Sequence, residues 1–452
     1  MCPTLPFAAR TTWRGSWSIK RPRILARSQP GENWYASKRL IGNHEGDYWP
    51  ISRRSMTEDD KGPLHSLKIL DFSTLLPGPF ATLTMADLGA DVLRVEAPNR
   101  PDLIRTLEPE DGYSSAAHSY LNRNKRCLSL DLKRPGAADL VKELVQEYDI
   151  VVEQFRPGVM SRLGIGYDEL KAANPRLIYC SITGYGQTGP YRDRAGHDCN
   201  YLALAGIASY SGSKRTGPTA SGFQIADVAG GSLHAVIAIL AAVVERQKSG
   251  VGQAIDISMT DAAFALNAIT GAGCLVSGRA EGFETHALTG GGFYGYYETS
   301  DGRYMSVGSL EPHFLSRLCE ALDVPTSSSP GLSLSSDESA ALRQSLRERF
   351  TNMTFDECRE LFAGIDACVE PVLTVNEGAS HPQMEARCMV TEVPAPDGKL
   401  QKQIANPIKF SRSSAAYRST GKQPGEDNEQ VLRELGKSKD EIDALTTDGV
   451  LG

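Results

Sequence analysis

Short apolar runs alternate with amphipathic segments along residues 66–183. The runs have the length and composition of buried strands, which we predict at residues 67–72, 91–96, 127–130, 150–153 and 177–183. Apolar positions at helical spacing predict helices at 81–88 and 137–148, the second starting just after Pro135. Such alternation favours an α/β fold with a mainly parallel sheet and helices on its faces.

The clearest helical pattern covers residues 227–248 and ends in Lys248, Ser249 and Gly250, a typical stop signal. Asp227 stands at the start of this helix. Unpaired backbone N–H groups at that end favour an ionised carboxylate. The alternative is a plain N-cap, because Asp is a leading residue at that position.

The sequence changes character near residue 285, where a triple glycine (Gly290–Gly292) and clustered tyrosines begin. Ser300–Gly302 is typical of a hairpin turn, so we expect a second domain to start here. Beyond it we expect a loop at 327–336 and three helices, at 340–350, 355–363 and 428–435.

Composition narrows the class of protein. The chain has 452 residues and a net charge of −7. Residues 1–55 hold ten Lys/Arg and three Asp/Glu, which leaves about −14 on the rest and argues against nucleic acid as a partner. This basic leader is either an organelle-targeting segment or the result of a start site placed before Met56, and we exclude it from the fold.

Cysteine and hydropathy patterns argue against metal and membrane. The nine cysteines include no CxxC pair, which suits free thiols in a reducing compartment. Cys358, Cys368, His381 and Cys388 have spacings that match no zinc finger or ribbon. The longest apolar run, 235–244, is half of the ~20 residues that cross a membrane. We expect no metal and no membrane partner.

Three acid/base residues are the candidate chemistry. His197 lies in GHDCNY, Asp227 in GFQIADVAGG and Glu311 in VGSLEPHF. A histidine and a carboxylate on opposite sides of one carbon could remove and return a proton. A classical nicotinamide site is disfavoured, because the first strand is followed by LLPGPF instead of GxGxxG.

A series of strings resembles the family III CoA-transferases, and specifically their α-methylacyl-CoA racemase branch. The strings run in order from residue 64 to the C-terminus: LKILDFSTLLPGPFATLTMADLGADVLRVEAP, NRNKRCLSLDLKRPG, FRPGVMSRLGIGYDEL, ITGYGQTGP, ERQKSGVGQAIDISMTDA, NPIKFS and VLRELG. The resemblance implies an interlocked homodimer with a Rossmann-like large domain (64–275 and 385–452), a small domain (276–384) and an N-terminal extension (1–63).

The resemblance also assigns roles. It implies that Asp227 and His197 flank Cα of a 2-methylacyl-CoA and that Glu311 supports His197. An enolate would form at the thioester, stabilised by backbone N–H groups near Asp227 or the glycines after it. No cofactor is implied beyond the CoA moiety of the substrate. The residues expected to hold CoA are Asp131, Lys133, Gln154, Phe155, Arg156, Arg162, Gly196, Asp198, Asn200 and Tyr201.

One position departs from the racemase pattern. Relatives often have an arginine where this chain has Ala97, and we expect Arg94 or Arg100 to compensate. Gly290–Gly292 resembles the family's mobile glycine-rich loop, although a tight hairpin would use the same residues.

Three activities stay open at this point. In the transferases of the family, the aspartate that Asp227 matches attacks an acyl-CoA and then carries CoA. A non-catalytic acyl-CoA binder is the third reading, and the intact trio argues against it. For His197 alone, a structural histidine bonded to Asp198 is the plain alternative. We expect His234 to be packed and His313 to lie on the surface. The acyl group is not predictable, and the expected location is cytoplasmic, or mitochondrial or peroxisomal in a eukaryote.

Overall fold

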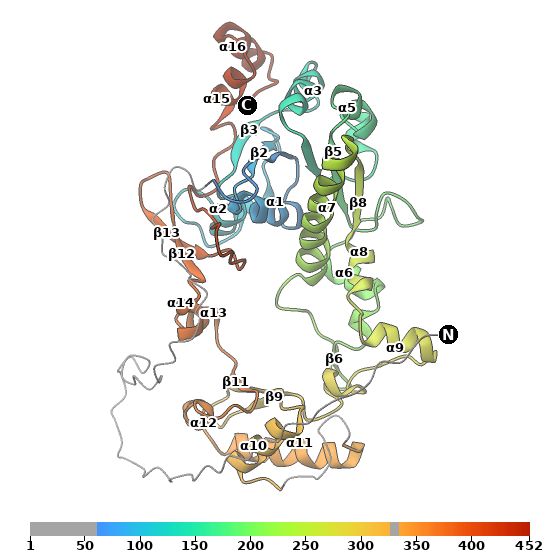
Figure 1. Cartoon of the computed structure of the whole chain (residues 1–452), viewed down its shortest axis with the longest axis vertical. Coiled ribbons are helices and arrows are strands. Elements are labelled where there is room, and N and C mark those ends of the chain that lie inside the picture. Colours follow the sequence, from blue (N-terminus) through green and yellow to red (C-terminus); the bar gives the residue numbers. More distant parts are fainter. Residues whose placement is uncertain (1–60, 326–333) are drawn as a thin grey trace, which may run out of the picture. The chain divides into compact units, whose positions relative to one another are not determined.

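Six parallel strands form the central sheet of the computed structural model, which describes residues 61–325 and 334–452 (Figure 1). They are β1 (Lys68–Asp71), β2 (Asp91–Glu96), β3 (Arg126–Ser129), β4 (Ile150–Glu153), β5 (Ile178–Thr183) and β8 (Ala254–Ser258). Each neighbouring pair in the order β3-β2-β1-β4-β5-β8 is parallel, which confirms the predicted fold class. β8 was not predicted, because Ile255 and Ile257 are its only strongly apolar residues.

The strand order reverses between β1 and β4. Connections that leave these two strands diverge at the carboxyl edge of the sheet, which opens the crevice where open α/β sheets bind ligands. Residues 72–76 follow β1, and Gln154 is the first residue after β4. The predicted CoA-binding residues that follow β3 and β4 therefore lie along this edge.

Helices cover both faces of the sheet and close two hydrophobic cores. On one face α3 (Ala137–Glu147) packs with α5 (Tyr167–Ala173) and with the C-terminal α15 (Asn428–Glu434) and α16 (Lys439–Thr447). On the other face lie α1 (Pro77–Asp87), α6 (Asp198–Leu204), α7 (Leu233–Ser249) and α8 (Met259–Ala265). Strand residues alternate between the two cores: Leu70 and Val151 belong to the first, Ile69 and Ile150 to the second.

A third core consists of residues between Phe293 and Val369 and shares no member with the other two. It joins the antiparallel sheet of β9 (Gly295–Glu298), β10 (Tyr304–Val307) and β11 (Val369–Pro371) to α10 (Pro312–Leu322), α11 (Ser336–Thr351) and α12 (Phe355–Phe362). The Ser300–Gly302 turn between β9 and β10 is confirmed, with Gly302 at φ +75°. Most of the predicted loop at 327–336 lies outside the described residues, and the proposed domain boundaries stay a prediction.

The predicted helix at 227–248 begins differently from expectation. Residues Ala226–Ser232 form a π-helix, η4, which continues directly into α7. Added side chains would lie 3.3 Å from Met259 O at Gly230, and 3.1 Å from Pro77 Cβ at Gly231. Small residues thus let the wide turn pack closely against α1 and α8, a feature that apolar periodicity does not reveal.

The other elements are short. The helices are η2 (Leu103–Thr106), α2 (Ala116–Leu121), α4 (Val159–Arg162), η3 (Ile207–Ser209), α9 (Thr270–Ser277), η5 (Ala287–Thr289), α13 (Val375–Ala379) and α14 (Pro382–Ala386). Two small antiparallel sheets pair β6 (Gly212–Ser213) with β7 (Gly217–Pro218) and β12 (Val390–Pro394) with β13 (Leu400–Ile404).

One helix has the length and hydropathy of a membrane span. The continuous helix Ala226–Ser249 has a mean hydropathy of 1.9 over its most apolar window and is long enough to cross a membrane. The bent pair α8 and α9 passes the same test together. A core helix of a folded protein passes it too, so the expectation of no membrane partner stays a prediction. Only 33% of that window is buried, so much of the apolar surface of α7 is exposed among the described residues.

Candidate active site

Asp227 and His197 lie in different segments, which the carboxylate of Asp198 connects. Asp227 lies in the first turn of η4, and His197 is the residue before α6. Between them, Asp198 Oδ1 accepts hydrogen bonds from the backbone N–H groups of Ala226 (2.6 Å) and Asp227 (3.1 Å). This linkage fixes the start of α6 against the start of η4.

Burial and neighbouring charge prepare the Asp227 carboxyl for proton transfer. Desolvation by burial is the main cause that raises its pKa to about 6, and the negative charge of Asp198 adds to it. A positive charge on His197 opposes this rise. A base with a pKa near working pH suits general acid–base chemistry.

The plain alternative for Asp227, a capping role, is not supported, because Ile225 is the N-cap of η4 and the Asp227 side chain caps no helix. The alternative for His197 stays open. Asp198 bonds to backbone N–H groups and not to the His197 ring, but His197 is the N-cap of α6 and forms a capping box with Asn200. His197 is exposed, with its N–H donating to Asn200 Oδ1 at 3.0 Å, so its side chain is accessible to a ligand.

A buried tyrosine holds the histidine loop. The Tyr201 hydroxyl donates to Gly196 O, and Tyr201 is only 5% exposed. Its ring lies so close to two glycines that an added Cβ would be 2.6 Å from it at Gly184 and 2.7 Å at Gly196. Tyr185 meets the Tyr201 ring edge-on at 5.3 Å. These contacts give Tyr201, Gly196 and Asn200 structural roles in shaping the loop, beside the CoA contact expected of them.

The expected donors to an enolate are partly occupied. The N–H groups of Ala226 and Asp227 bind Asp198, and that of Val228 binds Gln224 O at 3.0 Å. In contrast, the N–H groups of Asp198 and Cys199, at the start of α6, have no acceptor among the described residues. Donors for an oxyanion are thus found beside His197, not beside Asp227.

The other predicted CoA residues lie in the connections after β3 and β4. Asp131 Oδ1 accepts the N–H of Lys133 at 3.1 Å, and the Lys133 side chain is exposed. Arg156 and Arg162 are also exposed, whereas Phe155 packs partly against the first core. Two guanidinium groups with free donors at the sheet edge are suited to phosphate.

Gln154 has a role that the sequence did not reveal. Its Oε1 accepts the backbone N–H of Gly78 at 3.0 Å. The side chain therefore bridges the connections that leave β4 and β1, across the reversal of strand order.

A polar cleft of about 280 Å³ opens beside Arg156. Its wall includes Ser181, Gln187, Asp256 and the buried Glu153. Desolvation raises the pKa of Glu153 to about 7, with a smaller contribution from the charge of Asp256. This cleft lies at the β4, β5 and β8 side of the carboxyl edge.

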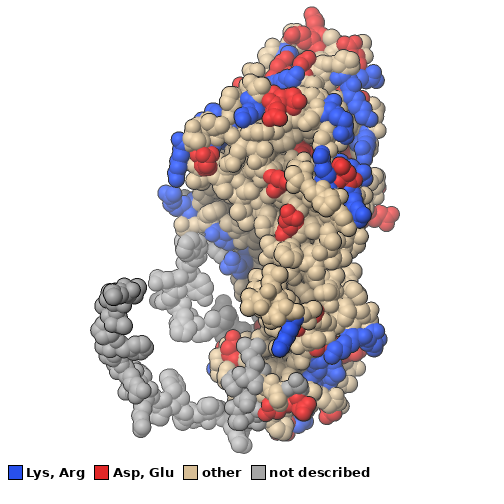
Figure 2. Space-filling view, turned by 90° about the vertical axis from the view of Figure 1, so that its right-hand side faces the viewer, with Lys and Arg blue, Asp and Glu red and all other residues tan. Residues whose placement is uncertain are grey.

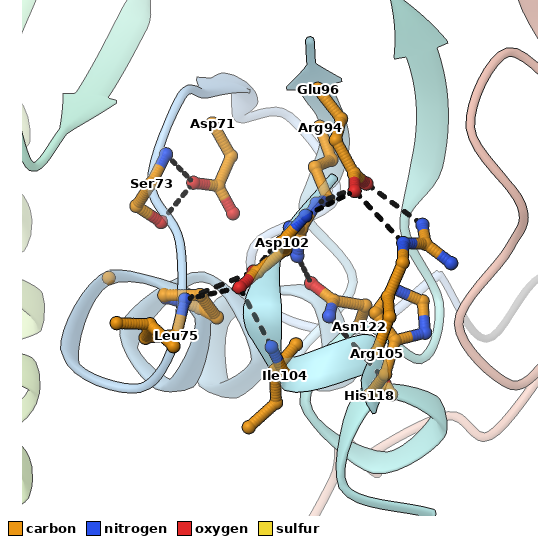
Figure 3. Close-up of polar contacts among 12 residues, drawn as sticks. Asp71, Ser73, Leu75, Arg94, Glu96, Asp102, Ile104, Arg105, His118 and Asn122 are labelled. Atoms are coloured by element: carbon orange, nitrogen blue, oxygen red, sulfur yellow. Dashed lines mark hydrogen bonds and ion pairs between the residues drawn. The ribbon is translucent and has the colours of Figure 1, made fainter. Parts of the chain in front are cut away.

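The expectation that Arg94 compensates for Ala97 is wrong. The Arg94 side chain is 2% exposed and donates to Asp102 Oδ2 at 2.6 Å and to Asn122 (Figure 3). A guanidinium committed to these buried partners cannot reach a ligand. Arg100 is exposed and keeps this possibility.

Glu311 belongs to the segment that forms the third core, and not to the elements that carry His197 and Asp227. It is the exposed N-cap residue of α10, and its charge adds to the rise that burial causes in the pKa of the Cys368 thiol. No contact with His197 or Asp227 is present among the described residues. Its proposed support of His197 is untested within one chain.

The remaining sequence candidates behave as structural residues. His234 Nδ1 contacts Ala229 O at 2.8 Å, and His313 is exposed, as expected. Arg343 of α11 donates to the carbonyls of Gly290 and Gly292. In residues 61–325 and 334–452 no group of three or more His, Cys, Asp or Glu could hold a metal ion.

Comparisons with known proteins place this geometry in context. Residues 64–428 match the family described as CoA-transferase family III. The human protein named alpha-methylacyl-CoA racemase is 34% identical over 86% of this chain and 97% of its own length. The human succinyl-CoA:glutarate CoA-transferase is 31% identical over 86% of this chain and 90% of its own length. A solved CaiB/BaiF family protein from Brucella suis is 32% identical with a TM-score of 0.72, covering 83% of this chain and all of the other.

Proposed function

The chain belongs to CoA-transferase family III, and from this membership and the site geometry we propose that it epimerises the α-carbon of a 2-methylacyl-CoA. The observation that carries the proposal is an exposed imidazole whose segment is joined through Asp198 to a carboxyl group with a pKa raised to about 6. A transferase nucleophile would need the carboxylate alone. Two neighbouring acid/base groups instead suit removal of a proton from one face and its return from the other.

In the proposed reaction, one member of the pair starts as base and the other as acid. His197 takes the α-proton while Asp227 delivers one to the opposite face, or the reverse for the other epimer. Only one member of the pair carries a proton at a time, so the pair can catalyse the reaction in both directions. A turnover of the opposite epimer returns that proton to the residue that carried it at the start.

Backbone donors support the proposed enolate. The free N–H groups of Asp198 and Cys199 point from the start of α6, next to His197. Charge that develops on the thioester oxygen would be stabilised by such fixed donors. We propose that no cofactor beyond the CoA moiety takes part, because acid–base chemistry at this carbon needs none.

The proposed homodimer would complete the site. Glu311 has no contact with His197 in its own chain, so its support of the imidazole would have to come from the partner subunit. Helices α6 to α9 lie on the right-hand side of Figure 1, which faces the viewer in Figure 2, and that face has a broad area without charged side chains. The exposed apolar residues there are Leu204, Leu233, Ile237, Val244, Phe264, Leu266, Ile269, Leu275 and Val276. Apolar surface of this extent supports a protein partner.

A CoA-transferase is the alternative. Relatives with that name have 30–35% identity, a range that includes the 34% of the racemase relative. Asp227 could attack an acyl-CoA to form an anhydride and then hold CoA as a thioester. In that reaction His197 would have no proton to move.

One assay separates the two activities. Purified protein is incubated in deuterated water with a single epimer of a 2-methylacyl-CoA, with and without a free carboxylic acid as acceptor. Without the acceptor, we expect deuterium at the α-position and conversion of the single epimer into a mixture of both epimers. His197→Ala and Asp227→Asn should each slow the exchange by about 10²–10⁴-fold.

The His313→Ala variant is the matched control, because this exposed histidine lies outside the pair. It should exchange at the wild-type rate. Transfer of CoA to the acceptor with no α-exchange, dependence on Asp227 and indifference to His197 would establish the transferase and refute the isomerase.

A further inference from the structure

A strained turn stands at the point where the strand order reverses. Leu75, in the connection from β1 to α1, has φ +60°, a left-handed conformation that non-glycine residues seldom adopt. Such strain persists only where the surroundings enforce it, and it is concentrated at functional sites. Leu75 and Leu76 are both half-buried, and Leu76 packs against the small cluster of Leu83, Ile104 and Leu121.

Asp102 enforces this conformation. Both of its carboxylate oxygens accept the Leu75 N–H, at 3.1 and 3.0 Å (Figure 3). The carboxylate is fully buried and receives Arg94 at 2.6 Å, while its own N–H donates to Glu96 Oε1 at 2.9 Å. Figure 3 shows that Asp102 lies between the turn and the buried Arg94–Glu96 pair of β2.

The far end of the same turn is joined to the candidate base. Ser232, the last residue of η4, places its Oγ 2.7 Å from Pro77 O and 3.1 Å from the carbonyl oxygen of Asp227. Directly after Pro77, the Gly78 N–H is held by Gln154. A Cβ added at Gly78 would be 2.1 Å from Ser73 Cβ, so the start of α1 packs closely against the end of β1. Polar contacts thus connect Arg94 to Leu75 and Pro77 to Asp227, and the backbone of residues 75–77 joins the two sets.

We propose that Asp102 is a positioning residue for the reaction at Asp227. By holding Leu75 in its strained conformation, it sets the turn that carries Pro77 and, through Ser232, the position of the Asp227 backbone. This inference rests on the proposed function, in that Asp227 must act on the thioester substrate.

The test compares four variants of the full chain for kcat, KM, epimer exchange, CoA transfer and melting temperature. Asp102→Asn should lower kcat about tenfold or more and change KM less than about threefold. Adding Leu75→Gly should return most of the lost kcat, because glycine adopts the left-handed conformation without support. Ser232→Ala, which leaves the ion pairs intact, should lower kcat by about fivefold.

Asp87→Asn is the matched control. Asp87 is also a buried carboxylate paired with a buried arginine, Arg123, at 2.6 Å, but it does not touch the turn. It should lower the melting temperature as Asp102→Asn does and leave kcat within about twofold.

The outcomes distinguish the two proposals. Wild-type protein without exchange or transfer refutes the proposed function. With an active wild type, a folded Asp102→Asn protein with unchanged kcat, or a loss that Leu75→Gly does not relieve, overturns the positioning role. If Asp102→Asn does not fold, an unchanged kcat in Ser232→Ala overturns it instead.

Discussion

Single residues decide the chemistry through their immediate surroundings. Asp227 was identified from the sequence, but its raised pKa depends on burial and on Asp198, a neighbour 29 positions away in the chain. Asp198 itself had been expected to contact CoA. The sequence therefore indicated the candidate acid and base but not the residue that connects their segments, because that contact depends on tertiary packing.

The shared proton gives the rate a distinctive pH dependence. The Asp227 carboxyl is protonated below about pH 6 and ionised above it. When both members of the pair carry a proton, as they do in acid, neither can act as the base. We expect kcat/KM for epimerisation to fall on both sides of an optimum, with the acid limb near pH 6. A plot from pH 4.5 to 9 measures this. An acid limb near pH 4, or a rate that stays flat on the alkaline side, would contradict a pair that shares one proton.

At the level of elements, five of the six strands of the central sheet were predicted to within a residue, whereas β8 and the turns of the candidate site were not. β2 and β4 have the predicted limits, because the apolar residues of β4 are continuous and those of β2 are broken only by Arg94. The π-turn of η4 and the strained Leu75 had no signal in apolar periodicity, since both depend on what packs against the backbone. The string LLPGPF indicated where the turn after β1 lies but not its backbone conformation.

The close approach of α6 to the β5 connection yields a test of element packing. Gly184→Ala would place a methyl group 2.6 Å from the Tyr201 ring and push the histidine loop outward. We expect the free energy of unfolding to fall by about 1–3 kcal/mol, together with a loss of exchange activity. Calorimetry and the deuterium assay measure the two effects.

Gly364→Ala is the comparison, because an added side chain there meets nothing within 4 Å. It should affect neither quantity. Full activity in Gly184→Ala would show that the loop tolerates displacement of Tyr201.

For the whole molecule, two features extend beyond one folded chain. Exposed apolar side chains lie along α7, with Ile237 63% and Val244 56% exposed, and Glu311 lacks the partner expected of it. Both features are expected if a second copy of the chain covers this surface. Residue patterns predicted the α/β class, whereas the dimer came from family resemblance alone, because no periodicity encodes contacts between chains.

A charge on α7 tests the proposed assembly. Ile237→Glu should convert a dimer to a monomer in analytical ultracentrifugation and abolish activity, because a buried unpaired carboxylate is costly at an interface. Leu400→Glu, on the exposed and separate β13, should leave both the mass and the rate unchanged. A monomeric wild type with full activity would exclude a shared site.

The π-helical turn that carries Asp227 has an evolutionary consequence. Each residue of an α-helix rotates the chain by 100°, so losing one codon between Ala226 and Ser232 could turn this segment into an ordinary helix. The aspartate would then face another direction while the sheet stayed intact. A descendant that keeps this fold but loses the position of Asp227 relative to Asp198 is thus a single deletion away.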